Sequence, residues 1–135
     1  MATKLPTYRN TGTVWDLELS QGATFGPVRH TLTNPDGTPL DLTGCVVRGQ
    51  VRRSALATEV LAEFVISYAP DRTEGWYTFG LSDEQTAALT AGEKLTDPAS
   101  TYAYDVELED ALGQVWRLLR GTLRVQAEVT REDTP

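Results

Sequence analysis

The sequence predicts an all-β fold: an immunoglobulin-like antiparallel β-sandwich of about seven strands with one short helix. Apolar and polar residues alternate with a period of two over several short runs, which is typical of strands with one buried face. Residues that favour turns separate these runs at the short spacing expected of a β-sandwich. Only one segment departs from the alternation. A small Greek-key barrel is the alternative fold.

The chain has 135 residues, enough for one domain with its own core. We assign residues 13–131 to the sandwich domain. Residues 1–12 form an N-terminal arm and residues 132–135 a C-terminal tail, because both ends are polar and show no period.

The first expected strand covers residues 13–22, where Trp15 and two leucines alternate with polar residues. Trp15 therefore belongs to the apolar face and is expected in the core. The second strand covers residues 23–33. Gly26 and Pro27 interrupt it, and because proline has no amide hydrogen, this site predicts a bulge or an edge position.

A tight turn at residues 34–37, Asn-Pro-Asp-Gly, links the second strand to the third, at residues 45–53. Residues 59–68 and 76–81 repeat the alternation and give the fourth and fifth strands. In the fifth, Tyr, Phe and Leu share one face. Trp76 falls on the opposite face, with a threonine and a glycine.

Residues 82–92 break the alternation and predict the one short helix. Ser82 and Gln85 have the spacing of a capping box, in which each side chain accepts a hydrogen bond from the backbone amide of the other residue. Gly92 is expected to close the helix.

Residues 102–109 and 115–129 predict a hairpin around a four-residue loop. Pairing Glu109 with Gln114 places acidic residues of the first strand opposite apolar and basic residues of the second, all on the outer face. The residues that this register turns outward on the second strand are Trp116, Leu118 and Arg120. Arg117 then falls among core positions, which do not suit a charged side chain. A bulge or the closeness of Arg117 to the turn would remove this misfit.

The charge of the chain disfavours nucleic acid as a partner. Twelve Lys and Arg residues stand against 19 Asp and Glu residues, a net charge of −7, so a basic surface for phosphates is not expected. No apolar run reaches the ~20 residues of a membrane span, and the first twelve residues lack the apolar region of a signal peptide. The single cysteine cannot form an internal disulfide, which fits a reducing cytoplasm.

Residues with catalytic or metal-binding chemistry are few, and we expect no enzyme, cofactor or metal site. The single histidine, His30, is interpreted as an ordinary surface residue, and Cys45 as a small core residue. Residues two apart on a strand lie nearly 7 Å apart, so a solvated strand face paired with arginines is favoured over a calcium site. The acidic residues concerned are Asp105, Glu107, Glu109 and Asp110.

The tryptophans on polar faces are the strongest indication of a binding surface. Aromatic and arginine residues are common anchors of protein interfaces, so we predict an interface that comprises Trp116, Leu118, Arg120 and Trp76. Coverage of these side chains by the helix or the N-terminal arm is the alternative. A platform for stacking a sugar is a third possibility.

Two pairs of motifs connect the chain to a known group. They are "GTPLDLTG" followed by "VVRGQVR", and "YAYDVELED" followed by "GQVWRLLRGTLRVQAEVTR". Together they resemble small proteins of tailed bacteriophages, in particular the N-terminal attachment domain of phage baseplate upper proteins. The resemblance covers residues 13–131 and implies a virion component, assembled in the host cytoplasm, whose partners are other phage structural proteins in a homo-oligomer or symmetric assembly.

The resemblance favours a tail, baseplate or fibre-attachment adaptor. A capsid decoration protein is one alternative. A carbohydrate-binding module for host surface glycans, with Trp76 or Trp116 stacked on a sugar, is the other.

Overall fold

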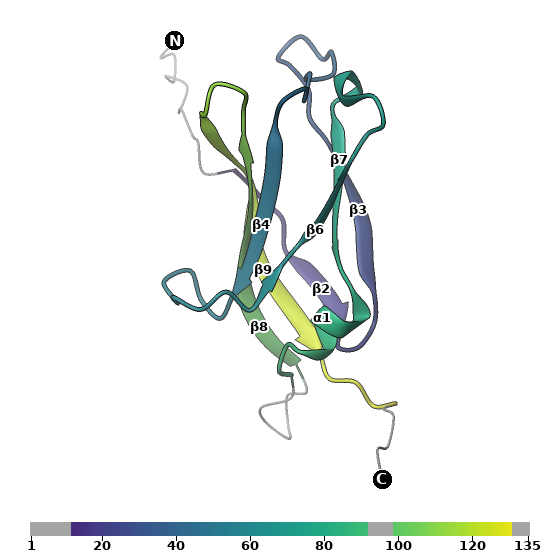
Figure 1. Ribbon diagram of the computed structural model, residues 1–135. Helices are drawn as coiled ribbons and strands as arrows, with labels where there is room; N and C mark the ends of the chain where they lie inside the picture. Colours follow the sequence, from purple (N-terminus) through teal and green to yellow (C-terminus); the bar gives the residue numbers. More distant parts are fainter. Residues whose placement is uncertain (1–11, 92–98, 131–135) are drawn as a thin grey trace, which may run out of the picture.

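The computed structural model describes residues 12–91 and 99–130, which form two β-sheets packed face to face (Figure 1). The arm expected at residues 1–12 lies outside the described residues except for Gly12, and the tail expected at residues 132–135 lies wholly outside them. The strands of the described part are β1 Thr13–Val14, β2 Leu17–Ser20, β3 Phe25–Thr31, β4 Val46–Arg52, β5 Ala62–Glu63, β6 Val65–Tyr68, β7 Trp76–Leu81, β8 Ala99–Glu109 and β9 Val115–Gln126.

The strand order is that of an immunoglobulin-like sandwich. Sheet A has the order β1-β9-β8-β4-β5, with β2 also paired to β9, and sheet B has the order β3-β7-β6. All pairs are antiparallel except those of β1 and β2, which run parallel to β9. Strands β4, β8 and β9 take the places of C, F and G in such domains, and β3, β7 and β6 those of B, E and D. The predicted fold class is confirmed, with nine described strands rather than seven.

The additional strands arise where two expected strands are broken. The fourth expected strand, residues 59–68, divides at Phe64: β5 pairs with β4 in sheet A, and β6 pairs with β7 in sheet B. The buried ring of Phe64 lies between the sheets, 5.4 Å from the Phe79 ring centre and 5.8 Å from that of Tyr104. Gly49 of β4 leaves room for it, because a Cβ there would lie 2.8 Å from the ring.

The first expected strand divides at Trp15 and Asp16. The Asp16 carboxylate accepts hydrogen bonds from the amide and the hydroxyl of Thr122, both at 3.0 Å, and the Tyr104 hydroxyl donates to the Trp15 carbonyl. A glycine is required opposite this kink, since a Cβ at Gly121 would lie 2.6 Å from the Trp15 carbonyl oxygen. Trp15 itself is 39% exposed, so the expectation of a core tryptophan is wrong.

The core lies between the inner faces of the two sheets and is closed by Leu42 and Leu89 from connecting segments. Alternate residues of β4, β7 and β8 supply half of its buried residues, as their periodicity predicted. The largest fully buried residues include Tyr77, Phe79, Leu81, Val106, Leu119 and Leu123. The Tyr102 hydroxyl donates to the Thr90 carbonyl, the arrangement called a tyrosine corner in immunoglobulin-like domains.

The remaining local predictions are partly confirmed. A register shift between Phe25 and Val28 marks the expected bulge at Gly26-Pro27. Helix α1 spans Asp83–Ala87 with the complete capping box, but it is capped at Ala88, short of the expected end, and Gly92 lies outside the described residues. Strand β9 ends at Gln126, short of the expected end at residue 129, and Val129 is 89% exposed. A short 3-10 helix, η1 Arg72–Glu74, occupies the turn before β7.

Candidate functional site

The outer face of sheet A carries an ordered arrangement of charges. The central strand β8 presents its acidic residues outward, and its neighbours β4 and β9 present arginines. Arg48 of β4 lies beside Glu107 of β8, and Arg120 of β9 lies beside Asp105. Because residues directly opposite on neighbouring strands are close enough to interact, an acidic row between two basic rows pairs its charges across the sheet.

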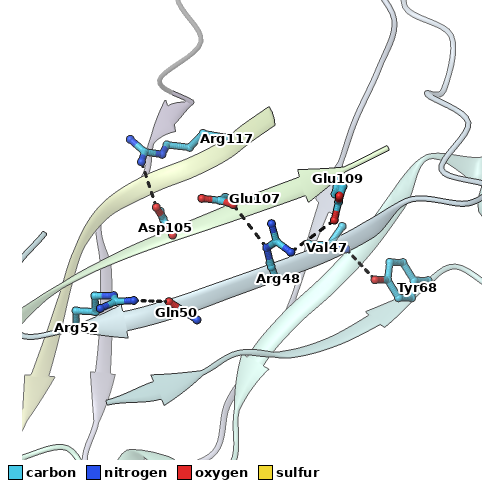
Figure 2. A network of polar contacts seen from close by, with 9 residues as sticks. All are labelled: Val47, Arg48, Gln50, Arg52, Tyr68, Asp105, Glu107, Glu109 and Arg117. Atoms are coloured by element: carbon cyan, nitrogen blue, oxygen red, sulfur yellow. Dashed lines mark hydrogen bonds and ion pairs between the residues drawn. The ribbon is translucent and has the colours of Figure 1, made fainter. Parts of the chain in front are cut away.

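The ion pairs follow this arrangement (Figure 2). Arg48 contacts two carboxylates, those of Glu107 and Glu109, each at 3.6 Å. Arg117 lies 3.4 Å from the Asp105 carboxylate. These side chains are partly exposed, where such pairs contribute little to stability, so their effect is to fix the pattern of charge on this face.

The expected hairpin register is wrong. Glu109 pairs with Val115 rather than Gln114, and between Arg117 and Leu119 the register shifts by a further residue. Leu118 is the extra residue of this bulge; it packs against the core rather than lying in an outer apolar patch. The bulge places Arg117 on the outer face with Asp105, and this removes the misfit that the sequence pattern contained.

Trp116 lies at the turn end of the hairpin, opposite the buried Leu108, and is 46% exposed. It has exposed apolar neighbours in the sequence and the sheet. Val46 and Val115 both pair with Glu109, one on each side, and Leu112 is 86% exposed in the turn. We call this group, Val46, Leu112, Val115 and Trp116, the hairpin end.

The turn that carries Leu112 is held by its own hydrogen bonds. The Asp110 carboxylate accepts from the amides of Leu112 and Gln114, both at 2.9 Å, and the Gly113 amide donates to the Asp110 carbonyl at 3.0 Å. Asp110 is therefore a turn residue rather than a ligand of an ion. A largely exposed leucine at a fixed position is typical of a contact residue.

A hollow of about 580 Å³ lies on the outer face of sheet A, beside the ion pairs. Small side chains such as Ala103 and Gly121 line it together with longer charged ones. Those charged residues are Asp16, Arg52, Asp105, Glu107, Arg117 and Arg120. Burial raises the pKa of Asp105 above its ordinary value, although the nearby Arg117 guanidinium favours the charged form.

Trp76 belongs to the other sheet. The Arg29 guanidinium lies over its ring, 3.6 Å from the centre, and its indole nitrogen donates to Glu74 at 3.0 Å. One face of this ring is thus covered, which leaves Trp116 as the more suitable candidate for sugar stacking. Trp76 begins β7 in sheet B, Trp116 lies near the start of β9 in sheet A, and Leu118 packs against the core, so the four predicted interface residues do not form one surface.

His30 and Cys45 do not form a catalytic arrangement with each other. His30 is half-buried rather than a surface residue; its Nδ1 lies 2.7 Å from the Tyr77 hydroxyl, and burial lowers its pKa. Cys45 is buried as expected, and burial raises the pKa of its thiol. Within residues 12–91 and 99–130, no group of three or more His, Cys, Asp or Glu side chains is placed to hold a metal ion.

The sequence did not indicate several residues of this face. Leu112 was placed only as part of a loop, although an apolar residue in a tight turn is a detectable signal. Arg52 falls within the third expected strand, residues 45–53, and was not singled out as a site residue. Leu56, 94% exposed in the loop between β4 and β5, follows Ala55 on the rim of the hollow, and Val14 lies on the rim at β1.

Comparison with known proteins does not identify the chain: no family model matches it, and no curated protein is significantly similar to it. In the described ranges, none of the helices is long and apolar enough to cross a lipid bilayer.

Proposed function

We propose that this chain is a non-enzymatic structural protein of a tailed-bacteriophage virion, an adaptor that binds other virion proteins at the tail, baseplate or fibre attachment. The motifs at residues 37–52 and 102–131, which resemble phage attachment domains, support the virion setting. Other phage structural proteins are the partners in this proposal, in a homo-oligomer or symmetric assembly.

The distribution of exposed apolar side chains supports a protein-binding role. Ten large apolar residues are exposed in the described part of the chain, and four of them form the hairpin end. Those four are Val46, Leu112, Val115 and Trp116. Soluble proteins seldom gather exposed apolar residues in one region without a partner, so this is the single observation that carries the proposal.

The experiment compares incorporation of variants into particles. Leu112→Ser combined with Trp116→Ala removes two exposed anchors, and since both side chains lie outside the core, the fold should be retained. Removing two such anchors costs on the order of 2–4 kcal/mol of binding, which is about thirtyfold or more in affinity. Val65→Ser is the matched control, because Val65 is 56% exposed on the outer face of sheet B.

Loss of the double variant from purified particles, with normal incorporation of Val65→Ser, is the expected result. Normal incorporation of the double variant would show that the hairpin end does not bind a virion partner. Separation of heads from tails before detection distinguishes the tail adaptor from a capsid decoration protein, because the same face could serve in either position.

A further inference from the structure

Two connecting segments pack beside the hairpin end: residues 36–45, which lead into β4, and residues 69–75, which lead into β7. The first segment touches the hairpin turn, because a Cβ at Gly44 would lie 3.2 Å from the alanine side chain of that turn. The second segment is tied to the first by Arg72, whose guanidinium donates to the Cys45 carbonyl at 2.7 Å. The hairpin turn and the two segments therefore form one continuous end of the sandwich.

Acidic residues predominate at this end. The two segments and the hairpin, residues 109–116, hold one arginine, Arg72, and six carboxylates: Asp36, Asp41, Asp71, Glu74, Glu109 and Asp110. Arg48 from β4 is shared between Glu107 and Glu109, and Arg29 from β3 lies over the indole that is hydrogen-bonded to Glu74. With these neighbours included, seven carboxylates stand against three arginines. The excess of four is more than half of that in the described residues, which hold 15 acidic and eight basic side chains.

Three of these carboxylates, Asp41, Asp71 and Asp110, are held in place by backbone amides, and we call them the acidic rim. Asp41 accepts from the Thr43 amide at 2.9 Å and Asp71 from the Thr73 amide at 3.0 Å, as Asp110 does within its own turn. Hydrogen bonds from the threonines lower the pKa of Asp41 and Asp71, although the Asp41 charge acts in the opposite direction on Asp71. Among the described residues, no arginine nitrogen lies within 4.0 Å of the rim carboxylates.

The acidic rim and the hairpin end together favour a basic contact over a neutral one. Leu112 lies two residues after Asp110 in a turn that the Asp110 carboxylate holds, so an exposed apolar side chain and a charge are fixed side by side. Lys and Arg side chains suit such a surface, because their apolar stems can lie along it while the charged group reaches a carboxylate. The exposed ring of Trp116 adds a face that attracts cations.

We propose that the hairpin end binds a segment of another virion protein in which Lys or Arg residues stand beside an apolar residue. The apolar side chain of the partner contacts Leu112 and Trp116, and its cations pair with the acidic rim. Charge complementarity selects this occupant, because the same end of a second copy would bring the same excess of negative charge to the contact. The inference rests on the proposed function and adds the chemistry of the partner.

The test is a nuclear magnetic resonance titration of the intact chain with two peptides. The probe is an acetylated and amidated peptide with two lysines on each side of a leucine, and the matched peptide has glutamines in place of the lysines. The lysine peptide should shift the amide signals of Leu112, Gly113 and Gly44 in a saturable way, and higher ionic strength should weaken its binding. Equal affinity for the two peptides would overturn the inference.

Two double variants locate the site. Asp41→Asn combined with Asp110→Asn removes two charges but keeps the side-chain oxygens to which the turn amides donate. It should weaken binding of the lysine peptide about threefold to tenfold, as expected for two exposed ion pairs. Asp83→Asn combined with Glu84→Gln is the matched control, because it changes the net charge equally in helix α1, beyond the other end of β7. Equal binding by the two double variants would overturn the inference.

The choice of partner has its own test. Lys4 and Arg9 are basic residues of this chain, so light scattering of the free protein is compared with that of Lys4→Gln combined with Arg9→Gln. A monomer in both cases is the expected result. Self-association that the double variant abolishes would overturn the inference, because the basic residues would then come from a second copy.

Particle incorporation separates this inference from the proposed function. If the Leu112→Ser, Trp116→Ala variant is lost from particles but the Asp41→Asn, Asp110→Asn variant is retained and the lysine peptide does not bind, the basic partner segment is wrong and the adaptor role stands. If the lysine peptide binds as expected but both of these variants are incorporated normally, the adaptor role through this end is wrong, and the identity of the partner with it.

Discussion

Replacement of Phe64 by alanine should destabilise the fold strongly, because this residue joins the two sheets. It is 6% exposed, lies where the chain passes from sheet A to sheet B, and contacts Phe79 and Tyr104 edge to face. Its amide also donates to the Gly49 carbonyl at 2.9 Å, so the backbone is held in place and the cavity cannot collapse easily.

The expected cost follows from the burial of the ring. Truncation of a buried phenylalanine to alanine costs about 3–5 kcal/mol, a large share of the roughly 5–15 kcal/mol that stabilises a typical domain. With a urea dependence of about 1–3 kcal/mol per M, the unfolding midpoint should fall by about 2 M. The neighbouring Val65→Ala is the control, since Val65 is 56% exposed and should change the free energy of unfolding by less than about 1 kcal/mol.

Urea unfolding of both variants, followed by tryptophan fluorescence, measures the two free energies. A cost for Phe64→Ala within about 1 kcal/mol of that for Val65→Ala would refute the reasoning, because such a result would mean that the aromatic contacts between the sheets are not a main source of stability.

Three further predictions concern single positions. The free energy of unfolding should decrease as the pH falls below about 6.5, because burial lowers the pKa of His30 and the unfolded chain then binds a proton that the folded chain does not. His30→Gln should make the free energy of unfolding depend less on pH, as measured by unfolding curves below about pH 6.5. Gly121→Ala should destabilise by about 1–3 kcal/mol in urea unfolding, since its Cβ would lie 2.6 Å from the Trp15 carbonyl oxygen. Cys45 should react with a maleimide only after unfolding, because it is buried and its thiol pKa is raised; fast labelling of the native chain would contradict this.

The sequence predicted the fold class because the inner faces of β4, β7 and β8 depend on simple alternation. Val47, Tyr77 and Val106 are all buried where a period of two places them. The helix start was also predictable, since Ser82 and Gln85 form their capping box through contacts only three residues apart.

The hairpin register was not predictable from alternation, because a single bulge reverses which side chains face outward. The one indication of the bulge in the sequence was Arg117, a charged residue at a position that alternation assigns to the core. The bulge moves Leu118 toward the core and gives Arg117 the carboxylate of Asp105, so the choice of arginine that pairs with Asp105 depends on tertiary pairing.

The division of residues 59–68 between two sheets also has no local signal. A strand that changes sheets and one that stays in a single sheet share the same alternation, and the choice depends on the partners that β4 and β7 offer. His30 was misplaced for a similar reason: its neighbours in sequence are polar, but the bulge at Gly26-Pro27 turns it toward Tyr77.

Thiol labelling of assembled particles tests the central claim, that the hairpin end is buried against a partner. Leu112→Cys places a reactive thiol at this end, Ser67→Cys places one on the exposed outer face of sheet B, and the native Cys45 is buried. Both introduced thiols should react quickly in the free protein. In particles, protection of Leu112→Cys with continued labelling of Ser67→Cys is the predicted result, whereas equal labelling of both, or protection of Ser67→Cys alone, would contradict the claim.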